Sequence, residues 1–96
     1  MKLIKFYAEW CQPCKMLSRI MEDIDLGVPI ENIDIDKNMD IAMQYGVRGV
    51  PMLVLVDEQG NTLKTKSGLL NEQQLFDFVK GVWYEHSRKT KEELYN

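Results

Sequence analysis

Two cysteines, Cys11 and Cys14, are the residues of this chain whose type and spacing point most directly to chemistry. They lie in the segment W-C-Q-P-C at residues 10–14, after an apolar run and at the start of a helical pattern. Two thiols one helical turn apart can form and release a disulfide within a single small loop. The chain holds no further cysteine. The spacing therefore predicts a dithiol/disulfide oxidoreductase.

The two thiols are expected to have different roles. A helix that starts at Cys11 would place this sulfur where unpaired N–H groups and the helix dipole favour an anion. Thiols in such positions have pKa values of roughly 3.5–7.5, whereas a free cysteine has about 8.5. Cys11 is then the nucleophile that forms a mixed disulfide with substrate, and Cys14, expected to be more buried, resolves it. Pro13 suits an early helical position, which needs no intrahelical N–H.

A zinc site is the alternative use of a C-x-x-C pair. A structural zinc ion takes four ligands, and this chain offers two cysteines and the distant His86. We therefore favour redox chemistry without a metal or bound cofactor, because the dithiol itself carries two electrons. His86 is expected to be a surface residue on the last helix.

Length and composition are those of a single small globular domain spanning residues 1–96, with 45% hydrophobic residues. The net charge of −3 and the lack of a basic stripe argue against nucleic-acid binding. The longest apolar run, at residues 50–56, is far shorter than the roughly 20 residues that span a bilayer. The charged start leads directly into the motif, so no signal peptide is expected. We expect a monomer in the reducing cytoplasm, where a C-x-x-C pair is more often catalytic than structural.

Apolar periodicity predicts the elements that must position the motif. Strands are expected at residues 2–8, 30–36, 52–57 and 62–66, and helices at 11–27, between 36 and 46, and from Asn71 to Val82. Helices between the first strands imply parallel pairing, and a four-residue turn before the last strand implies an antiparallel hairpin. This order, βαβαββα, predicts an α/β fold with a four-stranded mixed sheet. A charged tail follows from about residue 85.

Capping signals support the helix boundaries. Gly27 and Gly46 are expected to close the first two helices, and Asp36 or Asn38 to cap the second. Asn71 and Gln74 form a capping box that opens the last helix.

The residues around the cysteines resemble a known family. The segment K-F-Y-A-E-W-C-Q-P-C-K-M at residues 5–16 is similar to the active-site strand and helix of thioredoxins. The segment R-G-V-P at residues 48–51 resembles the thioredoxin loop whose cis-proline faces the dithiol. The resemblance runs from about Leu3 to Val82. It implies a minimal thioredoxin fold without the leading strand and helix of full-length members.

Several further residues acquire expected roles from this resemblance. Val50 and Pro51 would be joined by a cis peptide bond and would present backbone groups to an extended substrate. Trp10 would lie at the rim of the active surface in contact with substrate, and Gly68 would keep the substrate groove flat. An ordinary trans proline and a simple turn glycine are the alternatives for Pro51 and Gly68. Tyr7 is expected to pack in the core.

Two residues depart from the family pattern. Gln12 replaces the usual glycine of C-G-P-C and thereby affects the reduction potential. Lys5 stands where thioredoxins usually have a buried aspartate, and a buried lysine is unfavourable unless it is paired or neutral. We expect Lys5 to pair with Asp34 on the neighbouring strand and to tune the thiol of Cys14. The alternative is that Lys5 extends into water from the strand.

The resemblance implies a protein-disulfide reductase that an NADPH-dependent thioredoxin reductase recharges. Ribonucleotide reductase is a substrate of many thioredoxins, although no residue here selects it. Two alternatives stay open. One is a glutaredoxin-like or oxidising thiol exchanger, although the glutathione-binding residues of glutaredoxins are not found. The other is an accessory or binding subunit that works independently of redox turnover.

Overall fold

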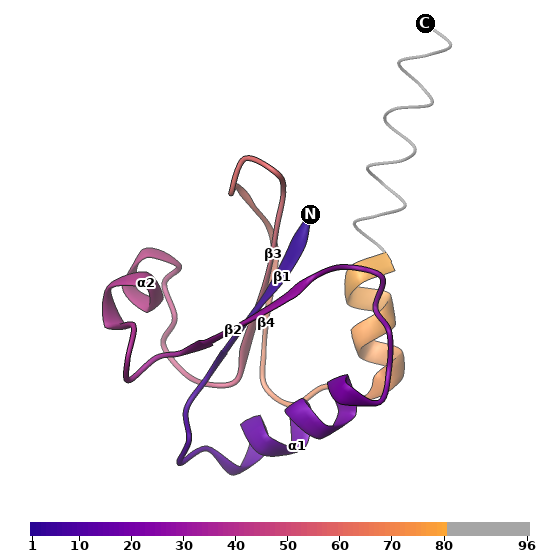
Figure 1. Ribbon diagram of the computed structural model, residues 1–96, viewed down its shortest axis with the longest axis horizontal. Helices are drawn as coiled ribbons and strands as arrows, with labels where there is room; N and C mark the ends of the chain where they lie inside the picture. The colour runs from indigo at the N-terminus through magenta and orange to yellow at the C-terminus, as the bar shows by residue number, and fades with distance from the viewer. Residues whose placement is uncertain (81–96) are drawn as a thin grey trace, which may run out of the picture.

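The computed structural model describes residues 1–80 and contains a four-stranded mixed sheet (Figure 1). Its strands are β1 (Lys2–Tyr7), β2 (Ile30–Asp34), β3 (Met52–Val56) and β4 (Thr62–Ser67), in the order β2-β1-β3-β4. β1 pairs in parallel with β2 and antiparallel with β3, and β3 forms an antiparallel hairpin with β4. This is the predicted arrangement. A crossover through a helix makes neighbouring strands parallel, and a short turn makes them antiparallel.

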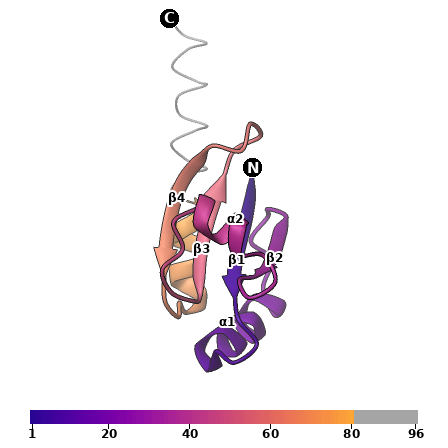
Figure 2. The same ribbon diagram turned by 90° about the vertical axis from the view of Figure 1, so that its left-hand side faces the viewer.

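Helices cover both faces of the sheet (Figures 1 and 2). α1 (Gln12–Glu22) and the C-terminal helix, helical over residues 72–80, pack on one face, and α2 (Met39–Gln44) packs on the other. Alternate strand residues point to opposite faces. Thus Leu53 and Leu55 join the core beneath α1, whereas Val54 and Val56 join the core beneath α2. The central strand β3 is buried over its whole length and belongs to both cores.

α1 ends earlier than the apolar pattern predicts. Its last residue is Glu22, with Asp23 as C-cap, so the expected continuation to Gly27 is wrong. The chain turns here because the Asp25 carboxylate accepts the backbone N–H of Gly27 at 2.9 Å. Such local side-chain bonds compete with helical ones. Ile24 still contacts the core, but from a loop rather than from the helix.

The capping box of the last helix is confirmed, whereas the side chain at the N-cap of α2 makes no capping hydrogen bond. The Asn71 side-chain oxygen accepts the Gln74 N–H at 2.8 Å, and the Gln74 side chain accepts the Asn71 N–H at 2.9 Å. Asn38, rather than Asp36, is the N-cap residue of α2, and Gly46 follows its end with a positive φ of 68°. Val82, His86 and the charged tail lie outside the described residues.

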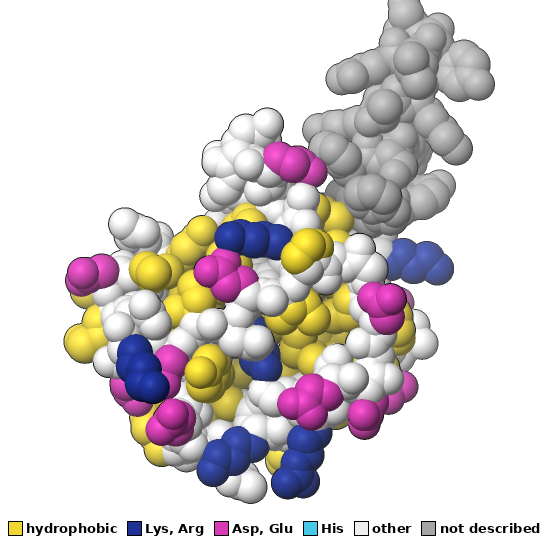
Figure 3. All heavy atoms as spheres, viewed as in Figure 1, with side chains coloured by type: hydrophobic (Ala, Val, Ile, Leu, Met, Phe, Trp, Pro, Cys, Tyr) yellow, Lys and Arg dark blue, Asp and Glu magenta, His cyan; other side chains and the backbone are white. Residues whose placement is uncertain are grey.

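Surface charge is mixed in sign. On the face seen in Figure 3, hydrophobic side chains gather near the middle, and acidic and basic side chains lie around them. This distribution agrees with the small net charge of −3.

Candidate active site

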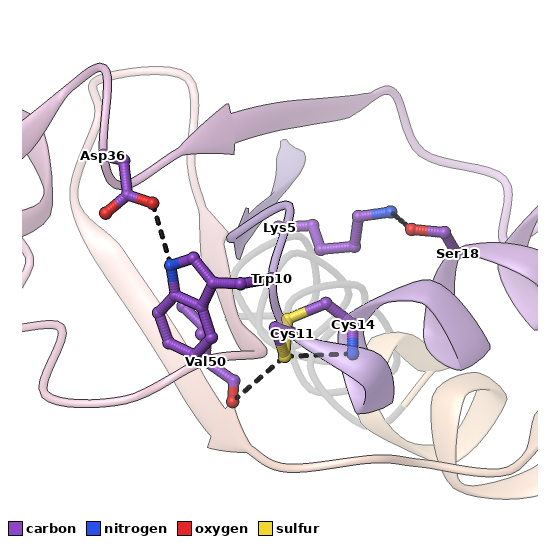
Figure 4. Close-up of a disulfide and its surroundings, with 7 residues drawn as sticks. All are labelled: Lys5, Trp10, Cys11, Cys14, Ser18, Asp36 and Val50. Carbon is purple, nitrogen blue, oxygen red and sulfur yellow. Dashed lines mark hydrogen bonds between the residues drawn. A yellow bond between two sulfur atoms is a disulfide. The ribbon is translucent and has the colours of Figure 1, made fainter.

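Cys11 and Cys14 lie where β1 leads into α1 (Figure 4). Cys11 is the N-cap residue and has an extended backbone, and Cys14 is in the first turn of the helix. Their sulfurs are joined in a disulfide, and their Cα atoms are 5.2 Å apart. Pro13 occupies one of the first helical positions, as predicted, where its missing N–H removes no helical hydrogen bond.

The backbone at this helix end favours negative charge on Cys11. The Cys14 backbone N–H donates a hydrogen bond to the Cys11 sulfur at 3.2 Å, so the sulfur takes the place of a capping oxygen. Once the disulfide is reduced, this N–H and the helix dipole stabilise a thiolate. The first turn of α1 contains no acidic residue that would oppose this effect.

Both cysteines are buried. Cys11 is 4% exposed and Cys14 is 2% exposed, which is the predicted order by a small margin. They cluster with Ala8, and Tyr7 and Val50 are among the side chains that border the cluster. The dithiol is therefore shielded from bulk water on most sides.

The loop before β3 lies across from the disulfide. The Val50–Pro51 peptide bond is cis, so the prediction from the resemblance is confirmed. The Val50 carbonyl oxygen lies 3.7 Å from the Cys11 sulfur (Figure 4). Gly68 donates its backbone N–H to the Pro51 carbonyl at 2.9 Å, which connects the end of β4 to this loop. Its positive φ of 94° favours glycine, while an added Cβ would meet no atom within 4 Å.

Trp10 is exposed at the border of the site. Its side chain is 69% exposed, and its indole N–H donates to the Asp36 carboxylate at 2.9 Å (Figure 4). The sequence predicts for Asp36 only a role as a helix cap. Its position directly after a strand, at the same sheet edge as the cysteines, is the signal that indicates a site residue. Tyr7 is only partly buried, so the prediction of core packing is correct only in part.

Lys5 is buried, but its partner is not Asp34. Its ammonium group donates to the Ser18 hydroxyl on α1 (Figure 4). The register of β1 and β2 places Asn32 opposite Lys5, whereas Asp34 lies opposite Tyr7. The Asp34 carboxylate instead accepts the Asp36 backbone N–H at 2.9 Å. The predicted ion pair is therefore wrong, because register and the turn after β2 hold that carboxylate elsewhere.

The alternative for Lys5, extension into water, is also wrong, because the residue is only 5% exposed. Burial lowers the pKa of the Lys5 ammonium from its ordinary 10.5, and the Glu22 carboxylate opposes this effect. The sequence prediction does not include Ser18 as a partner of Lys5. Its position four residues after Cys14, on the same face of the helix, is the signal that could have found it.

Within residues 1–80, no group of three His, Cys, Asp or Glu side chains is placed so that it could hold a metal ion. None of the helices in this part of the chain is long and apolar enough to cross a membrane.

A mixed four-stranded sheet with a C-x-x-C disulfide at the start of the helix after β1 defines a class, the thiol–disulfide oxidoreductases of thioredoxin-like fold. The family model described as Thioredoxin matches residues 1–81. The chain belongs to the thioredoxin family.

Individual relatives agree with this assignment. A thioredoxin of Buchnera aphidicola subsp. Baizongia pistaciae is 42% identical over 81 residues, which cover 80% of this chain and 73% of the relative. A thioredoxin of Pseudomonas aeruginosa is 37% identical, over 80% and 74% of the two chains. The solved structure of a mutant thioredoxin from Halobacterium salinarum NRC-1 has a TM-score of 0.77 and 39% identity, over 83% of this chain and 72% of the other. The chain is a thioredoxin-type protein-disulfide reductase with a C-x-x-C redox site.

Proposed function

We propose that Cys11 is the attacking thiolate and Cys14 the resolving thiol in the reduction of protein disulfides. The observation that carries this assignment is the hydrogen bond of 3.2 Å from the Cys14 N–H to the Cys11 sulfur at the N-cap of α1. Because this position favours an anion, Cys11 ionises first and reacts first. Cys14 lies one turn further along, close enough to displace whatever Cys11 has captured.

The reaction balances without a cofactor. The Cys11 thiolate attacks one sulfur of the substrate disulfide, whose S–S bond breaks, and the other substrate sulfur leaves as a thiolate and takes up a proton. Cys14 loses its proton and attacks the Cys11 sulfur of the mixed disulfide. The Cys11–Cys14 disulfide forms, and the second substrate thiolate leaves. Two electrons have then passed from the dithiol to the substrate.

The surface that receives substrate comprises Val50, Pro51, Gly68 and Trp10. A substrate segment that brings a sulfur to Cys11 must pass the Val50 carbonyl, which lies 3.7 Å from that sulfur. An extended segment can pair there with backbone groups of the loop. The exposed ring of Trp10 offers an amphipathic contact beside it. Gln12, exposed between the cysteines, contacts the same substrate and modulates the reduction potential.

Family membership supports a thioredoxin reductase, using NADPH, as the electron donor. We place the protein in the cytoplasm as a monomer of one domain, because a reducing compartment keeps the dithiol available. A protein substrate must present an accessible disulfide to Cys11. We assign no residue of this chain to the selection of one particular substrate protein.

Turnover assays test this proposal. The full chain should reduce the disulfides of insulin with NADPH and thioredoxin reductase as donor. Cys11→Ser should abolish turnover, and Cys14→Ser should accumulate a mixed disulfide at Cys11 that mass spectrometry detects. Turnover with glutathione alone, at the rate seen with the reductase, would instead favour a glutaredoxin-like exchanger. A biological activity that survives both serine substitutions would favour an accessory subunit.

A further inference from the structure

Lys5 is a buried cation to which the reaction described above assigns no role. Its side chain runs beneath α1 to the Ser18 hydroxyl (Figure 4). A buried ammonium group is unfavourable unless it is compensated. Among the described residues, Lys5 takes part in no ion pair, and its hydrogen-bond partner is a neutral hydroxyl. The positive charge is therefore not neutralised by direct contact.

Ser18 connects Lys5 to the helix that contains Cys14. Cys14 and Ser18 are four residues apart in α1, so their side chains share one face of the helix at neighbouring turns. A cavity of about 320 Å³ is lined by Lys5, Tyr7, Ser18 and Glu22 among others. A second cavity, of about 670 Å³, is lined by Cys14 together with Tyr7, Ser18 and Glu22. Because the two cavities share three lining residues, they lie next to each other along α1.

Other titratable groups near Lys5 and Cys14 come from α1, β1, β2 and the loop between β1 and α1. Glu22 of α1 lines both cavities, and its carboxylate acts against the effect of burial on Lys5. On β1, the ring centre of Tyr7 is 6.0 Å from the Lys5 ammonium nitrogen. On β2, the Asp34 carboxylate accepts a backbone N–H. The C-terminal helix packs on this face through apolar side chains. Further charged residues that line the Cys14 cavity are Glu9, Lys15 and Arg19.

We propose that the Lys5 ammonium group, anchored by Ser18, stabilises the thiolate form of Cys14 and thereby speeds the release of substrate from the mixed disulfide. This inference rests on the roles proposed above for Cys11 and Cys14. In the mixed disulfide Cys14 is the remaining thiol, and it attacks only as a thiolate. Lys5 and Cys14 are both buried, and the ammonium group is bonded to the residue one helical turn from Cys14, so its charge favours that anion. Lys5 touches no substrate and is a positioning residue.

The rate of this second step can be measured directly. Reduced protein is mixed in a stopped-flow instrument with an equimolar amount of Ellman's reagent, an aromatic disulfide whose thiolate absorbs visible light. Attack by Cys11 releases the first thiolate. Attack by Cys14 on the Cys11 sulfur closes the protein disulfide and releases the second. Because Cys14 is the remaining thiol in the mixed disulfide, the pH dependence of the second release reports its ionisation.

Lys5→Met removes the charge and keeps the length of the side chain. We expect the midpoint of the second release to move up by about one pH unit, which makes release about tenfold slower at pH 7. Lys66→Met is the matched control, because it removes the same charge from an exposed position on β4. It should leave the midpoint where it is in the native protein. A change that was merely structural would alter amplitudes or rates without moving the midpoint.

Ser18→Ala provides an independent test, because it keeps the positive charge of Lys5 and removes the hydroxyl group to which Lys5 donates. It should move the midpoint in the same direction by a smaller amount, with release about threefold slower at pH 7. If Lys5→Met fails to fold by circular dichroism, the midpoint of Ser18→Ala decides. An unmoved midpoint in a folded Lys5→Met, or an equal movement in Lys66→Met, would overturn the inference alone. The absence of any second release from the native protein would overturn the cysteine roles and this inference with them.

Discussion

The acidity of Cys11 is a property of a single residue, set by its place at the N-cap of α1. We expect iodoacetamide to alkylate Cys11 of the reduced protein at pH 7 about fivefold or more faster than it alkylates glutathione. The reason is the larger thiolate fraction that the Cys14 N–H and the helix dipole produce. Mass spectrometry of timed samples measures the rate, with Cys14 as the internal comparison. Equal rates for Cys11 and glutathione would contradict the proposed mechanism.

Lys5 links the protonation of one side chain to stability. Its pKa is lowered in the folded state, so between that value and 10.5 the unfolded chain binds more protons, and stability rises with pH. At a pH below the pKa of Lys5 in the folded state, the ammonium group is charged when it is buried, and this lowers the free energy of unfolding. We therefore expect Lys5→Met to raise the free energy of unfolding at pH 7 by about 1–3 kcal/mol.

Urea unfolding at pH 7 and near pH 11 measures this effect. The increase in the free energy of unfolding caused by Lys5→Met should be smaller at the higher pH, because the native Lys5 is then neutral in the folded protein. A variant that is less stable than the native protein at pH 7 would show that the lysine is better compensated than its contacts indicate. Together with slower release by Cys14, a gain in stability would identify Lys5 as a residue kept for function.

At the scale of the element, the C-terminal helix depends on the reciprocal hydrogen bonds of Asn71 and Gln74. Asn71→Ala removes one of them and leaves an unsatisfied N–H at the helix start, so we expect a loss of about 1 kcal/mol. Gln73→Ala is the matched control, because it removes only an exposed hydrogen bond to Asp77. That bond is worth a few tenths of a kcal/mol. Urea midpoints that do not separate the two variants would contradict the capping argument.

At the scale of the whole molecule, both cores meet in β3. This strand starts directly after Pro51, so the packing of its side chains also positions the loop that faces the dithiol. The sheet order places β3 beside β1, which leads into the cysteines. The two halves of the site are therefore held together by the central pair of strands.

Truncation of a β3 side chain should consequently destabilise the whole protein. Leu53 is fully buried beneath α1, and we expect Leu53→Ala to lower the free energy of unfolding by about 2–5 kcal/mol. Leu63→Ala on β4 is the control, because Leu63 is 39% exposed and loses less contact. Urea unfolding followed by circular dichroism compares them. Similar losses for both variants would show that β3 is not the centre of the packing.

The sequence by itself determined the features that depend on neighbours within one helical turn or one strand. The Cys11–Cys14 spacing, the early Pro13 and the capping box of Asn71 each involve residues at most three positions apart. Apolar periodicity then placed the strands and identified the mixed sheet. The end of α1 was wrong, because the Asp25 turn outweighed an apolar period that continued past it.

Only the tertiary structure decided which distant side chains meet. Lys5 and Ser18 are 13 positions apart, Trp10 and Asp36 are 26 apart, and Cys11 and Val50 are 39 apart. Periodicity assigns a residue to a face of the sheet, but the contact it makes there depends on strand register and on how α1 crosses that face. A local pattern contains neither quantity. For this reason the chemistry of the motif was predictable, whereas the partner of its buried lysine was not.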